Sequence, residues 1–94
     1  MSRTKVGDLL ESANSVDILL YIGEHPLCQK SEIYVNITRN AHTREKIDRL
    51  RKEGLLSIIP TGKANNSLLE LTEKGHRVVE LLSQIEDVLN PGFR

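Results

Sequence analysis

The 94-residue sequence predicts one domain of the α+β class, mainly α, with a three-helix core, a β-hairpin and a long last helix. Two observations support this prediction. A basic run free of glycine and proline, TREKIDRLRKE, is followed almost at once by two β-prone segments, LLSIIP and SLLEL, with the turn-rich TGKANN between them. The final segment, EKGHRVVELLSQIEDVL, keeps apolar residues at helical spacing until Pro91 and Gly92 end it.

The first half of the chain predicts short helices around a buried one. Residues 6–10 are spaced for one or two helical turns. The segment VDILLYIGE follows Ser15, a possible N-cap, and is apolar enough for the domain centre. It should stop before Pro26, because the residue that precedes a proline disfavours the helical region. Residues 27–29 can form a short strand beside the hairpin, and a further helix should open at residue 30 or 31.

The basic run should form a helix with well-defined ends. Thr43 can cap its N-terminus, and Ile47 and Leu50 form a narrow apolar stripe. Gly54 can close the helix, because a left-handed conformation costs glycine little. Thr72, after the second β-prone segment, can cap the last helix.

This order of elements indicates a winged helix-turn-helix. Two short helices joined by a turn form the helix-turn-helix, and the hairpin behind them forms the wing. We expect a single domain over residues 1–94, with the core and wing at 15–72 and the C-terminal helix at 73–90. The helix at about 43–53 should enter the major groove of DNA, and the wing at 55–72 should contact the flanking backbone or minor groove.

Positive charge gathers on the same stretch. Between Arg39 and Lys63 there are seven basic and three acidic residues, although the chain as a whole has no net charge. A local basic surface on a neutral protein is what phosphate binding requires. The segment therefore predicts a nucleic-acid contact.

Two motifs resemble the winged-helix transcription regulators of prokaryotes, in the broad MarR/ArsR-like group. KIDRLRKEGLL is similar to their recognition helix running into the first wing strand, and LTEKG, at Leu71 to Gly75, to their second strand running into the last helix. The resemblance spans Ser15 to about Leu82. It implies a homodimer that binds double-stranded operator DNA and regulates transcription. The single cysteine, Cys28, cannot form an internal disulfide and indicates a reducing cytoplasm. The metal-ligand cysteines of ArsR-type sensors are absent.

Arg44 and Arg49 are expected to read bases, because a guanidinium can bond guanine O6 and N7 together. Lys46, Lys52 and Arg39 are expected to hold phosphates and set the register. A plainer interpretation is an ordinary solvated helix, since Glu45 with Arg49 and Asp48 with Lys52 are favourable (i, i+4) pairs. The expected DNA contacts are Arg39, Thr43, Arg44, Lys46, Arg49, Lys52 and Lys63, with Arg44 and Arg49 at base edges and Lys63 at the tip of the wing.

The last helix has more apolar surface than one core needs. Val78, Leu82, Ile85 and Leu89 recur at the spacing of a coiled-coil seam, and neighbouring residues widen the stripe. At about 100° per residue the apolar arc covers half the helix, which predicts packing on a second copy. The expected dimer interface is Leu81, Leu82, Ile85, Val88 and Leu89, and the apolar residues at 6–10 are expected to cover the same seam.

Other function classes receive little support from the sequence. No carboxylate pair, nucleophile–base set or glycine-rich phosphate loop stands out, so we expect no enzyme activity and no cofactor. His25-x-x-Cys28 has the spacing of metal ligands but lacks a second pair, and we expect no metal. No apolar run approaches the ~20 residues of a membrane span. The alternative to DNA binding is a winged-helix module that binds other proteins within a larger assembly.

Overall fold

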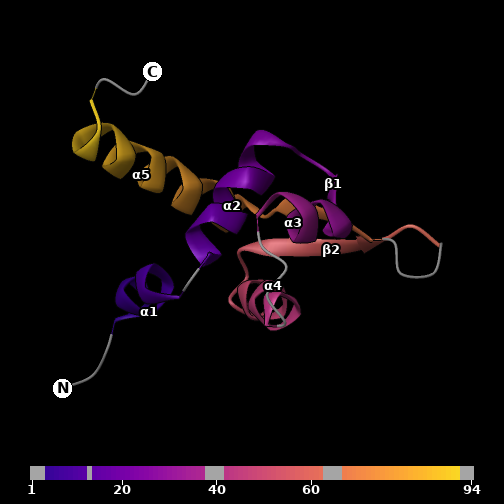
Figure 1. Cartoon of the computed structure of the whole chain (residues 1–94). Coiled ribbons are helices and arrows are strands. Elements are labelled where there is room, and N and C mark those ends of the chain that lie inside the picture. The colour runs from indigo at the N-terminus through magenta and orange to yellow at the C-terminus, as the bar shows by residue number, and fades with distance from the viewer. Residues whose placement is uncertain (1–3, 13, 38–41, 63–66, 92–94) are drawn as a thin grey trace.

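The computed structural model describes residues 4–12, 14–37, 42–62 and 67–91, and within them it contains five helices and one three-stranded sheet (Figure 1). This confirms the predicted class, a mainly helical fold with a hairpin and a long last helix. The elements in chain order are α1 (Lys5–Glu11), α2 (Ser15–Glu24), β1 (Cys28–Gln29), α3 (Lys30–Asn36), α4 (Thr43–Lys52), β2 (Leu56–Pro60), β3 (Ser67–Leu71) and α5 (Glu73–Leu89).

The sheet is antiparallel, with β3 between β1 and β2. Leu69 of β3 faces Cys28 of β1 on one side and Ile58 of β2 on the other. The strand β2 ends at Pro60, whose nitrogen has no hydrogen to donate to a longer ladder. The hairpin β2–β3 is the predicted wing, and β1 is the predicted short strand beside it.

The helix α2 lies at the centre of the molecule, where it contacts α1, α4, α5 and β3 (Figure 1). Its apolar residues Ile18, Leu19 and Ile22 are almost completely buried. These side chains pack with buried residues of the three strands and of α3 and α4. The remaining core residues are Cys28, Ile33, Ile47, Leu50, Leu55, Leu56, Leu69 and Leu71.

The helix α3 is held against α2 by a carboxylate. Glu32 Oε2 accepts from the backbone N–H of Gln29 at 2.8 Å, and its Oε1 accepts from the Tyr21 hydroxyl at 2.8 Å. The Gln29 N–H first and the Tyr21 hydroxyl second hold the pKa of Glu32 below its usual range. The same contact raises the pKa of the Tyr21 phenol.

The ends of α4 and α5 follow the predictions, with one correction. Gly54 has φ of 79° and ends α4, and the Thr72 hydroxyl accepts from Gly75 N–H at 3.0 Å to cap α5. The prediction that Thr43 caps α4 is wrong, because His42 occupies the N-cap position. Thr43 lies one turn before Ile47, on the same face of the helix, and its side chain is buried with that face.

Candidate nucleic-acid interface

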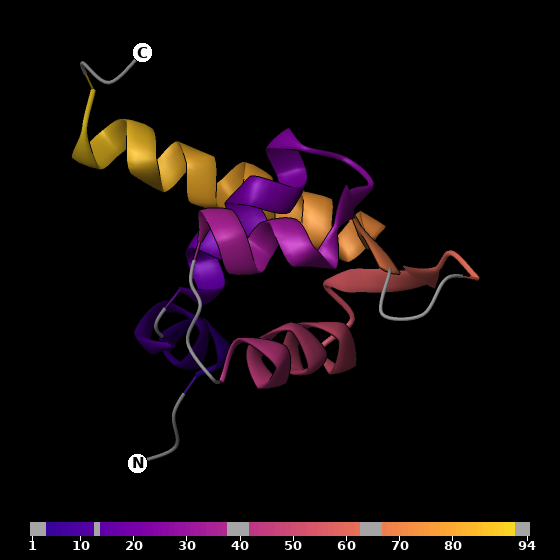
Figure 2. The same cartoon turned by 45° about the vertical axis from the view of Figure 1, so that its right-hand side comes forward.

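The helix α4 runs along one side of the molecule, with α5 on the opposite side and the wing at one end (Figure 2). Ile47 and Leu50 anchor it to the core, and both are nearly inaccessible to solvent. The anchoring residues occupy one stripe of the helix, so the rest of its circumference faces outward.

This outward face is basic. The helix contains five basic and two acidic residues. Arg44, Arg49, Arg51 and Lys52 are exposed, and Lys46 is half-buried. At about 100° per residue, Lys52 and Arg49 lie near the middle of the outward face, with Arg44 on one flank and Lys46 on the other.

The two acids of α4 are engaged within the chain. Asp48 accepts from Arg51 Nη2 at 2.7 Å and lies 3.3 Å from Lys52 Nζ. Arg51 first and Lys52 second hold the pKa of the Asp48 carboxyl below its usual range. Asp48 therefore offsets one of the two positive charges of Arg51 and Lys52 in the free protein.

The acid Glu45 lies 3.3 Å from His42 Nδ1, and the predicted pair of Glu45 with Arg49 is not formed. The predicted pair of Asp48 with Lys52 is present. In the described part of the chain, no ion pair holds Arg44, Lys46 or Arg49. These three cations are available to an external anion without first leaving an acidic partner.

Lys46 and Arg49 line a small hollow between α4 and α1, of about 50 Å³, together with Asp8 and Ser12. The outward face of α4 is thus continuous with the surface of α1 on this side. Sequence reasoning did not place α1 beside the basic helix, because no local pattern reports contacts between segments so far apart in the chain.

Three of the predicted contact residues need separate comment. Arg39 and Lys63 lie outside the described residues. The prediction that Thr43 contacts DNA is not supported, because its side chain is 0% exposed and belongs to the core face of α4. The structure therefore leaves Arg44, Lys46, Arg49 and Lys52 as the candidate contacts that it describes.

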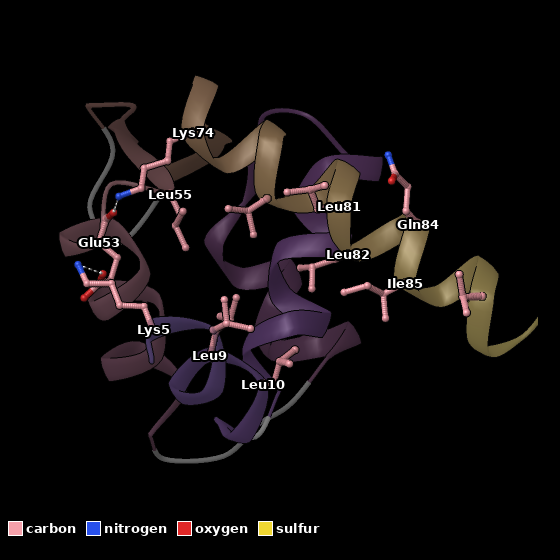
Figure 3. Close-up of a pocket in the computed structure, with 13 residues that line it drawn as sticks. Lys5, Leu9, Leu10, Glu53, Leu55, Lys74, Leu81, Leu82, Gln84 and Ile85 are labelled. Atoms are coloured by element: carbon pink, nitrogen blue, oxygen red, sulfur yellow. Dashed lines mark hydrogen bonds and ion pairs between the residues drawn. The ribbon is translucent and has the colours of Figure 1, made fainter. Parts of the chain in front are cut away.

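A second surface lies between α1 and α5 and adjoins the small hollow beside α4, since Leu9, Glu53 and Leu55 line both. It is an apolar groove of about 620 Å³, in which Leu81, Leu82 and Ile85 of α5 face Leu9 and Leu10 of α1 (Figure 3). We call it the α1–α5 groove; it is lined by Lys5, Val6, Leu9, Leu10, Glu53, Leu55, Lys74, Val78, Leu81, Leu82, Gln84, Ile85 and Val88.

The apolar surface predicted for the last helix is exposed in the single chain. Val88 and Leu89 are 79% and 75% exposed, and Leu81 and Ile85 are about half exposed. Leu82 differs from these four because it is half-buried and packs against the core. That a second copy covers this surface stays a prediction.

The other candidate sites of the sequence have ordinary structural roles. Cys28 is buried in the core, where burial raises the pKa of its thiol, and the His25 ring stacks on Tyr21 with centroids 4.1 Å apart. No group of three or more potential metal ligands occurs among the residues that the structure describes. Within the same residues, no helix is both long enough and apolar enough to cross a membrane.

Comparison with solved structures identifies the fold. The crystal structure of MarR matches with a TM-score of 0.75 and 21% identity over 96% of this chain. A MarR protein from Peptoclostridium difficile matches with a TM-score of 0.74 and 22% identity over 96% of the chain. The chain has the winged-helix fold of the MarR regulators. No family model matches its sequence, and no curated protein does.

The match covers only part of these two proteins. The chain spans 65% of the MarR structure and 63% of the Peptoclostridium difficile protein. A transcriptional regulator homologue from Pyrococcus horikoshii OT3 is nearer in length: the match covers 93% of this chain and 90% of that one, with a TM-score of 0.71 and 17% identity. In this MarR-type fold α3 and α4 form the helix-turn-helix, β2 and β3 form the wing, and α5 is the long C-terminal helix.

Proposed function

We propose that the protein is a sequence-specific DNA-binding regulator of transcription that acts as a homodimer in the cytoplasm. The helix α4 enters the major groove, and the wing lies on the flanking backbone or minor groove. The observation that carries the proposal is the outward face of α4, where Arg44, Lys46 and Arg49 have no acidic partner among the described residues. The solved structures that share the fold include regulators of transcription.

The cations divide into two roles by chemistry and position. Arg49 lies near the middle of the outward face and Arg44 on its flank, and a guanidinium can make a bidentate bond to guanine. Lys46 and Lys52 contact phosphates, together with Arg39 before the helix and Lys63 on the wing. Lys52 must exchange its contact with Asp48 for a phosphate, so it adds less to affinity than its exposure suggests.

The dimer forms through the α1–α5 groove. Burying a leucine-sized side chain is worth about 1.5–3 kcal/mol, and α5 exposes four such side chains, Leu81, Ile85, Val88 and Leu89. Two copies double the contribution, which offsets the entropy lost on association. Two-fold pairing is the commonest closed arrangement, and it presents two α4 helices to half-sites about 34–36 Å apart.

The rival function, a protein-binding module, predicts an apolar patch on the outward face of α4. The exposed large apolar residues among the described positions are instead Val6, Leu10, Leu27, Val35, Leu81, Ile85, Val88 and Leu89. None of them belongs to α4, so the surface of this helix favours DNA over a protein partner.

The proposal is tested by binding of random-sequence duplex DNA at ~50 and ~200 mM salt, measured by fluorescence anisotropy. If about five phosphates are neutralised per protomer, log K should fall with log salt at a slope of roughly −4 to −5 for each protomer bound, and about twice that for the dimer. Arg77→Ala, which removes an exposed cation from α5, is the matched control for Arg49→Ala and should leave binding almost unchanged. No detectable binding by the wild type at ~50 mM salt would refute the proposal.

A further inference from the structure

The helices α4 and α5 are joined to the same end of the wing: α4 precedes β2, and α5 follows β3. Three residues, Glu53 to Leu55, separate α4 from β2, and Thr72 alone separates β3 from α5. The last pair of the hairpin ladder, Leu56 with Leu71, lies immediately next to both connections. No flexible linker therefore stands between the helix that we place on DNA and the helix that we place at the dimer interface.

Hydrogen bonds fix these two connections to each other. Three consecutive carbonyls accept from the start of α5: Glu53 from Lys74 Nζ at 2.9 Å, Gly54 from the Thr72 hydroxyl at 2.5 Å, and Leu55 from Thr72 N–H at 3.1 Å. These three carbonyls belong to the connection that follows α4, so the contacts fix this connection to the start of α5. We call residues 53–55 and 72–75 together the α4–α5 junction.

The Thr72 hydroxyl links both helices through one atom. It donates to the carbonyl that follows α4, and it accepts from the Gly75 N–H in the first turn of α5. One oxygen thus caps the N-terminus of α5 and binds the connection that ends α4. A change in the direction of either helix must stretch one of these two bonds.

Close packing adds to the hydrogen bonds. Gly75 is buried, and a Cβ added there would lie 1.9 Å from the Leu55 carbonyl oxygen. Only glycine permits this approach of α5 to the connection. At the solvent side, Glu53 also lies 3.5 Å from Lys5 of α1, so a third helix contacts the junction (Figure 3).

We propose that Thr72 and Lys74 are positioning residues that set the spacing of the two half-sites. They do so by fixing the angle between α4 and α5, because in the dimer α5 meets its copy while α4 meets DNA. The helix α5 has 17 residues and is about 26 Å long, so a tilt of ~8° moves its end by ~3.5 Å, about one base pair. This inference rests on the proposed function.

The test compares the wild type with Thr72→Val, Thr72→Ser and Lys74→Met. Wild-type protein first selects sites from a random-sequence duplex pool, and the selected site is then remade with one base pair inserted or deleted between its half-sites. We expect the wild type to prefer one spacing by roughly tenfold, comparable with the effect of one mismatched base pair. Thr72→Val should reduce this preference to about threefold or less and leave affinity for an isolated half-site unchanged, whereas Thr72→Ser retains the preference.

The outcomes separate this inference from the proposed function. A wild type that enriches no sequence refutes the proposed function. A wild type that enriches paired half-sites, with Thr72→Val keeping the same spacing preference, refutes the inference alone. Equal loss of half-site affinity and spacing preference also refutes it, since Thr72 would then only support α4. If circular dichroism shows Thr72→Val unfolded, Lys74→Met decides: a reduced preference supports the inference and an unchanged one overturns it.

Discussion

Replacing Val88 by glutamate should dissociate the proposed dimer without unfolding the domain. Val88 is 79% exposed in the single chain, near the free end of α5, so its side chain adds little to the core. Full burial of a valine is worth ~1.5 kcal/mol, so the exposed fraction leaves ~1.2 kcal/mol to be gained per copy and ~2.4 kcal/mol per dimer. Losing this amount raises the dimer dissociation constant by about 50-fold. A carboxylate forced into an apolar interface adds to that loss.

Sedimentation velocity from about 1 to 100 µM measures the effect, with circular dichroism to show that the fold is retained. The matched control is Ser83→Glu, which adds the same charge to the same helix at an exposed position facing away from the groove. Val88→Glu should sediment as a folded monomer and bind DNA much more weakly, while Ser83→Glu behaves as the wild type. Wild-type protein that is monomeric at tens of micromolar, or equal effects of the two variants, would refute the reasoning.

Three further predictions concern DNA binding and acid stability. Arg49→Ala should cost ~1–3 kcal/mol of binding free energy on the selected site and relax discrimination at one base pair, whereas Lys52→Ala should weaken binding to all sequences alike. Competition with mutated duplexes distinguishes the two effects. A uniform loss of affinity for Arg49→Ala would contradict its role as a base reader. Asp48→Asn should raise DNA affinity for all sequences several-fold at low salt and steepen the dependence of log K on log salt, because it releases Lys52. Unchanged anisotropy titrations would show that the Asp48–Lys52 pair does not affect DNA binding. The pKa of Glu32 is lowered by folding, so its contribution to stability is complete above the unfolded value and is lost as pH falls below about 4.5. Glu32→Gln should therefore lose less thermal stability between pH 7 and 3 than the wild type does, and parallel melting curves would argue against this contribution.

Local patterns in the sequence predicted most of the fold. The apolar stripe of Ile47 and Leu50, the glycine at position 54 and the cap at Thr72 each depend on neighbours within a turn or two, and all three were found as expected. The cap at Thr43 was wrong because two favourable roles competed. A threonine can cap a helix, but one placed four residues before Ile47 also lies on the buried face. Thr43 is therefore buried as the first residue of the helix, and His42 takes the N-cap position.

The contacts around the candidate site were harder to predict, because they join distant segments or competing partners. Asp48 had two cations within reach, and the sequence spacing favoured Lys52, but Arg51 makes the shorter contact. The hydrogen bond from Lys74 to the carbonyl of Glu53 joins residues 21 positions apart, and no periodic pattern in the sequence predicts such a contact. The LTEKG motif contains Thr72 and Lys74, the two residues whose side chains bind the connection that follows α4.

Because the chain has no net charge, the proposed DNA binding by α4 should depend on dimerisation through the α1–α5 groove. Charges separated by more than about 10 Å are largely screened at ~0.1 M salt, so long-range attraction to DNA is weak for a protein without net charge. Affinity must then come from short-range contacts of α4, and a single α4 offers only a few cations. Joining two copies through α5 makes the second half-site contact intramolecular, which can raise affinity by ~10²–10⁴ without any new type of contact. We therefore expect a chain of this composition to bind DNA tightly only as a dimer, which would make the exposed apolar surface of α5 as necessary to the proposed function as Arg44 and Arg49.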